Sequence, residues 1–199
     1  MAAVRSLEAV SGPEEDRILV TQTLEGDLGA YEQLVNRHHA VVTRIAARVV
    51  GRDEAEDVAQ DAFLRAFHRL DGFRGDSSVR TWLLRIAHHA ALDHLRRRRA
   101  EPVDPASLDE TPAVERSRLP AERLELRERV ERLEHKLQLL SPPHRAVLVL
   151  RDVEGLSYGE VAAITETPLG SVKGRLHRAR RELIGLLRTN TYDWELPDE

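Results

Sequence analysis

The stretch GLSYGEVAAITETPLGSVKGRLHRARREL, residues 155–183, decides the fold of this chain of 199 residues. Ser157 is a good N-cap for a helix, and Glu160, three positions later, completes a capping box. Residues 165–167 then predict a turn, and Pro168 begins the next element. This pattern indicates two helices joined by a tight turn, which is a helix-turn-helix motif.

The second helix of the motif has one apolar and one basic face. Val172, Leu176 and Leu187 recur at helical spacing. The other face carries Lys173, Arg175, His177, Arg178, Arg180 and Arg181. A helix fits the major groove of DNA, where arginine can bridge guanine and other cations hold phosphates. The motif therefore predicts DNA binding, and the alternative is a solvated basic face on an ordinary helix.

The rest of the chain divides into two helical blocks. Apolar residues recur at helical spacing over residues 17–99 and 123–188, and we find no strand-like alternation and no internal repeat. Residues 100–122 hold four prolines and six acidic residues, a composition typical of a flexible linker. Residues 1–16 read as a polar tail, and residues 189–199 as an acidic tail. We expect an all-α protein of two small helical domains joined by this linker, with the helix-turn-helix motif over about 157–178 in the second.

The net charge of −4 conceals an uneven distribution. Residues 84–99 hold five arginines against one acid, and residues 171–188 hold six basic residues against one acid. Two basic segments separated by acidic ones suggest two sites for a polyanion. No apolar run approaches the roughly 18 residues of a membrane span, so we expect a cytoplasmic protein without membrane insertion.

The composition also argues against several kinds of chemistry. The chain has no Cys, which excludes disulfides, iron–sulfur clusters and a Cys nucleophile. It has neither the phosphate-binding G-x-x-x-x-G-K-[ST] motif nor H-E-x-x-H. His88, His89 and His94 are spaced poorly for metal ligands on one helical face. We therefore expect no enzymatic activity, no catalytic residue, no metal and no cofactor.

Several motifs, in a fixed order, resemble the extracytoplasmic-function (group IV) sigma factors of bacterial RNA polymerase, within the sigma-70 family. The resemblance covers roughly residues 20–99 and 123–188. In addition to the helix-turn-helix motif, it is carried by DVAQDAFLRAFHRL (57–70), FRGDS (73–77), TWLLRIA (81–87), LSPPHR (140–145) and LRDVEGLSYGEVA (150–162). The resemblance implies that the first block is sigma region 2, which binds core polymerase and the −10 promoter element. It implies that the second block is region 4, which reads the −35 element.

The implied contacts with core polymerase lie on one helical face. The resemblance assigns Asp57, Gln60, Asp61 and Leu64 to the clamp of the largest catalytic subunit. Without the resemblance, an intrahelical pair of Asp61 with Arg65 would be the preferred interpretation. The resemblance further implies a contact with the flap of the second largest subunit, and an anti-sigma factor as a partner.

The implied −10 contacts begin in a loop. Residues 73–79 match the segment with which these sigma factors capture a flipped base of the −10 element. Aromatic and polar groups in a loop suit an unstacked base, because the rings stack on it and the polar groups hydrogen-bond with it. The whole assigned set is Phe73, Arg74, Asp76, Ser77, Arg80, Trp82, Arg85, His88, His89, Arg96 and Arg97. Trp82 can equally belong to the core, and the 96–99 arginines can serve as phosphate contacts alone. His89 stands where the family often has Asn.

The implied −35 contacts centre on the second helix of the motif. They are Arg151, Ser171, Lys173, Gly174, Arg175, His177, Arg178, Arg180 and Arg181. The resemblance implies that the chain is a sigma factor that acts with core RNA polymerase on promoter DNA. The alternative function is a stand-alone helix-turn-helix regulator, which would dimerise on a palindrome. A further hypothesis is that Tyr192, Trp194 and Leu196 of the acidic tail mask DNA contacts, and its alternative is a disordered tail.

Overall fold

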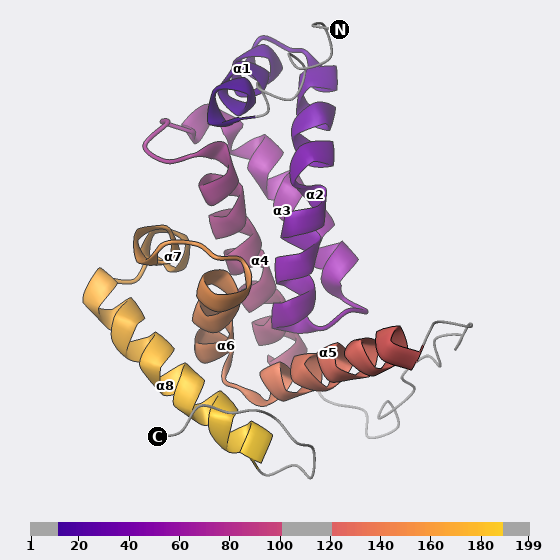
Figure 1. The fold of residues 1–199 in the computed structure, drawn as a ribbon. Helices are drawn as coiled ribbons and strands as arrows, with labels where there is room; N and C mark the ends of the chain where they lie inside the picture. The colour runs from indigo at the N-terminus through magenta and orange to yellow at the C-terminus, as the bar shows by residue number, and fades with distance from the viewer. Residues whose placement is uncertain (1–11, 101–120, 189–199) are drawn as a thin grey trace, which may run out of the picture.

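The computed structural model describes residues 12–100 and 121–188, and within these ranges all regular structure is helical (Figure 1). The first block contains α1 (Pro13–Leu24), α2 (Leu28–Val50), α3 (Ala55–His68), the 3-10 turn η1 (Leu70–Gly72) and α4 (Val79–Ala100). The second block contains α5 (Ala121–Leu139), α6 (Pro142–Leu148), the π-helical turn η2 (Val149–Val153), α7 (Tyr158–Thr165) and α8 (Leu169–Arg188). The predicted all-α class with two helical domains is confirmed. Residues 101–120, which make up most of the expected linker, and the hypothesis on the acidic tail lie outside the described residues.

The first helix begins earlier than the sequence predicts. Helix α1 starts at Pro13, within the stretch that reads as a polar tail up to residue 16. Proline at the first helical position and three acidic residues in the first turn both favour a helix start there. Asp16 is buried and hydrogen-bonds with Arg37 at 2.8 Å and with His38 at 2.9 Å, which ties α1 to α2.

Local signals set the ends of the next helices. Asp27 caps α2, because its Oδ1 accepts a hydrogen bond from the Gly29 N–H at 2.8 Å. Gly51 ends α2 with a φ of +113°, a conformation that favours glycine. At the start of α4, the Ser78 hydroxyl accepts a hydrogen bond from the Thr81 N–H at 3.0 Å.

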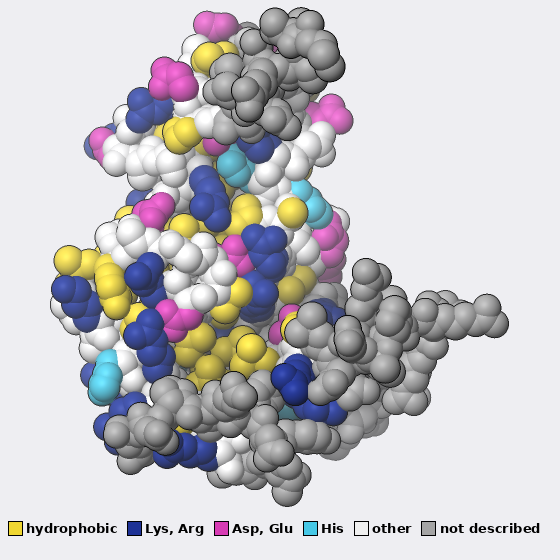
Figure 2. Space-filling view, in the orientation of Figure 1, with side chains coloured by type: hydrophobic (Ala, Val, Ile, Leu, Met, Phe, Trp, Pro, Cys, Tyr) yellow, Lys and Arg dark blue, Asp and Glu magenta, His cyan; other side chains and the backbone are white. Residues whose placement is uncertain are grey.

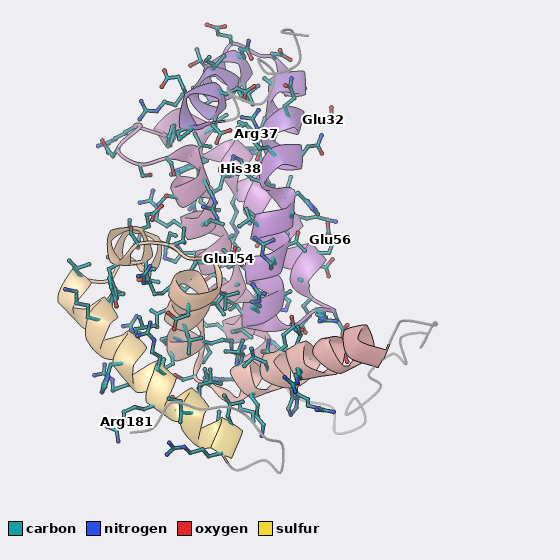
Figure 3. All side chains as sticks on the ribbon, viewed as in Figure 1. Glu32, Arg37, His38, Glu56, Glu154 and Arg181 are labelled. Atoms are coloured by element: carbon teal, nitrogen blue, oxygen red, sulfur yellow. The ribbon has the colours of Figure 1, made fainter. Side chains whose placement is uncertain are left out.

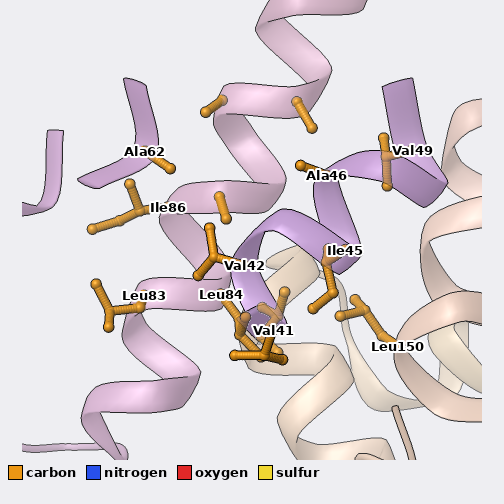
Figure 4. Close-up of a cluster of buried hydrophobic side chains, with 14 of the residues drawn as sticks. Val41, Val42, Ile45, Ala46, Val49, Ala62, Leu83, Leu84, Ile86 and Leu150 are labelled. Carbon is orange, nitrogen blue, oxygen red and sulfur yellow. The ribbon is translucent and has the colours of Figure 1, made fainter. Parts of the chain in front are cut away.

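The core of the first block is mainly aliphatic, in a chain of which only 4% of the residues are aromatic. The inward faces of α2, α3 and α4 meet in it, with Val42, Ile45, Val49 and Leu84 almost fully buried (Figure 4). Leu150 of η2 reaches the same cluster, so the buried apolar interior runs on from the first block into the second.

The two blocks pack against each other, which the sequence did not predict. Helix α7 lies on α4, while α5, α6 and η2 lie on α2 (Figure 1). Gln138 of α5 donates a hydrogen bond to the Arg48 carbonyl of α2 at 3.1 Å. Arg52, just after α2, pairs with Glu134 at 2.5 Å. The two predicted domains therefore form a closed arrangement in this structure.

A buried arginine lies at the centre of this contact. Arg145 of α6 is 5% exposed, and its guanidinium donates to the carbonyls of Val49, Gln138 and Leu140 and to the Gln138 side chain. These carbonyls lie at the C-terminal ends of α2 and α5, where unpaired carbonyls and the helix dipole favour a cation. Burial lowers the pKa of this guanidinium, so the carbonyl contacts offset a desolvation cost.

Candidate nucleic-acid and polymerase interfaces

The helix-turn-helix motif forms as the sequence predicts. The Ser157 hydroxyl accepts a hydrogen bond from the Glu160 N–H at 3.2 Å, and the Glu160 carboxylate accepts one from the Ser157 N–H at 2.8 Å. The bond that the Ser157 N–H donates to the Glu160 carboxylate is the main cause that lowers the pKa of this carboxyl, and a bond from the Ser157 hydroxyl lowers it further. Glu166 ends α7 in the left-handed conformation, with a φ of 49°, and α8 begins after a short turn at Leu169.

The residues GLSYG (155–159) also match the G-x-S-x-G pattern of hydrolase nucleophiles. The structure excludes that interpretation for Ser157. The residue precedes a helix in an all-helical region, whereas the hydrolase pattern needs a strand-to-helix turn. Its hydroxyl also donates to Glu160 at 2.8 Å and so serves the capping box.

Helix α8 separates its two faces as expected. Val172, Leu176 and Ala179 are at most 1% exposed and Leu187 is buried. Figure 2 shows Lys and Arg side chains gathered along α8 at the lower left. The predicted −35 residues that are exposed are Ser171, Lys173, His177, Arg178, Arg180 and Arg181. Gly174, Arg175 and Arg151 are half-buried.

Three of the predicted −35 cations contact residues that the sequence analysis missed, Tyr158 and Asp152. Arg151 lies over the Tyr158 ring at 4.8 Å from its centroid, and Lys173 lies 5.8 Å from the same centroid. Such contacts stabilise a cation against an aromatic face. Arg180 forms a bidentate pair with Asp152, at 2.9 and 2.6 Å, which raises the pKa of its guanidinium.

A pocket of about 370 Å³ opens at the loop between η1 and α4. Its walls include six of the predicted −10 residues: Phe73, Arg74, Asp76, Ser77, Trp82 and Arg85. Trp82 is only 6% exposed and lies 5.4 Å, between ring centroids, from Phe73, so it belongs to the core and also lines the pocket. Arg17 of α1, which the sequence analysis missed, donates to the Gly75 carbonyl at 3.0 Å and so fixes the loop.

The second block closes over this side of the first block. Ala163 of α7 forms part of the pocket wall. His89 of α4 faces Glu166 at 3.6 Å. His88 is 4% exposed in this closed arrangement, so its predicted contact with DNA stays a prediction for a form in which the second block has moved away from α4. Burial lowers the pKa of His88 from 6.5 to about 4, with smaller contributions from His89 and Arg175.

The remaining predicted −10 residues lie elsewhere on α4. Arg80 is half-buried near its start. Arg96 and Arg97, near its end, are exposed, with Arg96 paired to Asp93 at 3.2 Å and Arg97 at 3.9 Å from Asp61. The helix therefore presents its predicted DNA contacts in two separate groups.

Helix α3 presents the predicted polymerase contacts. Asp57, Gln60 and Leu64 are exposed, and Leu64 is a large apolar side chain that is 62% exposed. Asp61 is half-buried and pairs with Arg65 at 2.8 Å, as the alternative interpretation predicts. Arg65 also bridges to Asp93 of α4 at 2.7 Å. The four predicted residues share one face, although one of them is engaged within the protein.

Among the described residues there is neither a candidate metal site nor a helix that could span a membrane. Within 12–100 and 121–188, no group of three or more His, Asp or Glu side chains is arranged to hold a metal ion. His94 instead hydrogen-bonds with Glu54 at 2.9 Å. In the same ranges, no helix combines the length and apolar character needed to cross a membrane.

Comparison with known proteins identifies both blocks. The sigma-70 region 2 family matches residues 34–101, and the sigma-70 region 4 family matches residues 130–183. The RNA polymerase sigma-H factor of Pseudomonas aeruginosa is 37% identical over 178 residues, which is 85% of this chain and 92% of that protein. The ECF RNA polymerase sigma-E factor of Escherichia coli K12 is 35% identical over 175 residues, which is 84% of this chain and 92% of that protein.

Solved structures share the fold. CnrH in complex with the cytosolic domain of CnrY has a TM-score of 0.64 and 32% identity, over 89% of this chain and 99% of that chain. The sigma factor RpoE from Bartonella quintana, in complex with the anti-sigma factor NepR, has a TM-score of 0.59 and 23% identity, over 80% of this chain and 98% of that chain.

Proposed function

Because the chain belongs to the extracytoplasmic-function sigma factors of the sigma-70 family, which direct promoter-specific initiation by RNA polymerase, we propose that its two blocks divide promoter recognition between them. The first block reads the −10 element and the second block reads the −35 element. The observation that carries this division is the pocket beside α4, which gathers six side chains expected at the −10 element in one place.

In the −10 step, a base flipped out of the duplex enters the pocket. Phe73 and Trp82 offer aromatic surface for stacking, while Asp76 and Ser77 offer hydrogen-bonding groups that select the base. Arg74, Arg85, Arg96 and Arg97 hold the sugar–phosphate backbone. Arg80 and His89 complete this set once the second block has moved away from α4.

In the −35 step, the basic face of α8 enters the major groove. Lys173, Arg175 and Arg178 lie in its first half, where side chains reach base edges. Arg180 and Arg181, a turn later, hold phosphates, and Arg151 supports the base contacts from η2. Ser171 and Gly174 allow the backbone to approach the DNA closely.

The exposed face of α3 binds core polymerase. Asp57, Gln60 and Leu64 combine charge, an amide and an apolar side chain on one surface, which suits a basic partner with an apolar centre. We propose the clamp of the largest subunit as this partner, and the flap of the second largest subunit as a partner of the second block. Sigma factors are non-catalytic, so the chain has no reaction of its own and acts where the polymerase is, in the cytoplasm.

An anti-sigma factor is a further proposed partner. The CnrH chain, which is similar over 89% of this protein, was solved with the cytosolic domain of CnrY. A protein that covers both the pocket and the basic face of α8 would block the two promoter contacts together.

In vitro transcription with core polymerase over a promoter library tests this function. We expect transcripts from a subset of promoters that share a −35 and a −10 sequence, at a fixed spacing. A gel shift with and without core enzyme then separates the alternative. Tight binding of the chain alone to a palindrome, with no transcript after core polymerase is added, would favour a stand-alone regulator instead.

A further inference from the structure

Glu154 connects the two blocks through a buried carboxylate. It directly follows η2, at the entrance to the helix-turn-helix motif, and its side chain is 4% exposed (Figure 3). The carboxylate accepts hydrogen bonds from Arg44 Nε at 2.8 Å, Arg44 Nη2 at 2.7 Å and Arg48 Nη1 at 2.8 Å. The bond from Arg44 is the main cause that lowers the pKa of this carboxyl. Glu154 is therefore ionised and held by two arginines of the other block.

Arg44 and Arg48 form a two-pronged anion site on α2. They are four residues apart, so their side chains project from the same helical face. The geometry is that of a fork of guanidinium N–H groups around one oxyanion, which suits a phosphate as well as a carboxylate. Arg80 lies near enough to lower the pKa of Glu154 and of Glu160 as well. Arg80 thus adds a third positive charge on the first block near Glu154.

This site lies on the side of the first block that carries the −10 pocket. The turn η2 packs on α2, and α7, which follows it, packs on α4 and contributes Ala163 to the pocket wall. One continuous part of the second block therefore covers the arginine pair and the pocket together. The Arg44 side chain is still 46% exposed at the edge of this contact.

The closed arrangement is incompatible with binding both promoter elements. The −35 and −10 elements are roughly 25 base pairs apart, on the order of 80 Å at about 3.4 Å per step. In the closed arrangement the helix-turn-helix motif touches the −10 pocket itself. The blocks must therefore separate on the promoter. Glu154 then moves away from Arg44 and Arg48, which remain on the side of the first block that carries the −10 pocket.

We propose that Arg44 and Arg48 form a phosphate-binding site for the promoter strand beside the −10 pocket, and that Glu154 occupies this site in the closed arrangement. The inference deepens the proposed −10 function and rests on it. Glu154 and a DNA phosphate compete for the same guanidinium groups, so the second block restrains DNA binding by the first until it is drawn away.

Binding of single-stranded DNA to the full chain, without polymerase, tests the competition. The probes are a fluorescein-labelled dT12 and the −10 strand selected by the transcription assay, each measured by anisotropy over a range of salt. We expect Glu154→Gln to bind both probes at least about threefold more tightly, because the competing carboxylate is gone. Glu182→Gln is the matched control, since it breaks a pair with His144 inside the second block, and its affinity should equal that of the wild type. Equal affinity for Glu154→Gln and the wild type would overturn the competition.

The arginine pair is then removed in the Glu154→Gln background. Arg44→Ala with Arg48→Ala should lower the affinity and reduce the slope of log K against log salt by about 1.4, because each phosphate that a cation neutralises on a single strand accounts for about 0.7. Arg44→Ala alone, at the half-exposed position, should reduce the slope by about 0.7 even if the double variant fails to fold. An unchanged slope in a folded variant would exclude the phosphate site.

These outcomes separate the inference from the proposed function. If the wild type initiates transcription but the salt slope does not respond to the arginine variants, the phosphate site is wrong and the sigma function stands. If the slope responds but core polymerase yields no transcript, the site stands as a nucleic-acid contact and the proposed division of promoter recognition fails.

Discussion

Arg44 and Glu154 form a bidentate ion pair, with distances of 2.8 and 2.7 Å, although they are 110 residues apart in the chain. One belongs to α2 and the other to the entrance of the helix-turn-helix motif. The pair therefore holds a DNA-reading motif against the block that carries the −10 pocket. Its presence makes the separation of the blocks a measurable step in promoter binding.

Acidification should favour the separated blocks through His88. In the closed arrangement the pKa of His88 is about 4, because burial of the ring, beside His89 and Arg175, disfavours its charged form. In the separated form the ring meets water, and its pKa returns to about 6.5. The separated form then binds more protons below pH 6.5, so the closed form loses stability as the pH falls from about 6.5 toward 4.

The expected size of this effect is about 2 kcal/mol between pH 7.5 and pH 5, which follows from the two pKa values. Compactness measured by small-angle X-ray scattering over this range should fall with acidification in the wild type. His88→Leu should flatten most of the dependence, because the titrating ring is removed. A dependence of equal size in His88→Leu would assign the effect to other groups.

Arg145 should be important for stability rather than for DNA binding. Arg145→Ala leaves the carbonyls of Val49 and Leu140 buried without their donor and creates a cavity. We expect a loss of about 3 kcal/mol in the free energy of unfolding, measured with urea. Arg181→Ala, at an exposed position whose side chain points away from the protein in Figure 3, should change stability by less than about 0.5 kcal/mol. Similar values for the two variants would contradict this account of the buried guanidinium.

Tyr158 should position two of the −35 cations. Replacing its ring by Leu removes the aromatic face against Arg151 and Lys173, and we expect a loss of about 1 kcal/mol in −35 recognition by the holoenzyme. Tyr158→Phe keeps the face and should retain most of the activity. The check is transcription from promoter pairs that differ only in the −35 element. If Leu and Phe behave alike, the ring does not act through these cations.

The exposed face of α3 should be required for association with core polymerase. Asp57→Arg reverses a charge on this face, and we expect at least about a tenfold weaker association, because a repulsive contact replaces an attractive one. Glu56→Arg is the matched control, since Glu56 is also exposed on α3 but pairs with His39 of α2. Pull-down with core polymerase measures both variants. Equal weakening would point to damage to α3 itself.

Signals within a few residues of each other predicted the local structure well. The capping box of Ser157 and Glu160 and the apolar face of α8 depend on short spacings that the sequence displays directly. The loop residues of the −10 pocket are similarly adjacent in the chain, so the resemblance could assign them as a group.

Contacts between the blocks were beyond the reach of the sequence. Nothing in the sequence around Arg44 or Glu154 indicates that the carboxylate of Glu154, in the second block, will be buried against α2 of the first block. His88 stands beside His89 in an otherwise mostly apolar stretch of α4, and the sequence does not show that α7 of the second block packs on this helix. Asp16 was missed although its partners lie in the same block, because Arg37 and His38 belong to another helix and are more than 20 residues away in the chain.

Separation of the blocks on the promoter is the central claim, and fluorescence energy transfer between them tests it most directly. The chain has no Cys, so Asp71→Cys and Val153→Cys label one exposed site in each block. The closed arrangement predicts high transfer efficiency in the free protein and low efficiency in the promoter complex with core polymerase, while the labelled protein still makes transcripts. Efficiency that stays high in an actively transcribing complex would contradict the account.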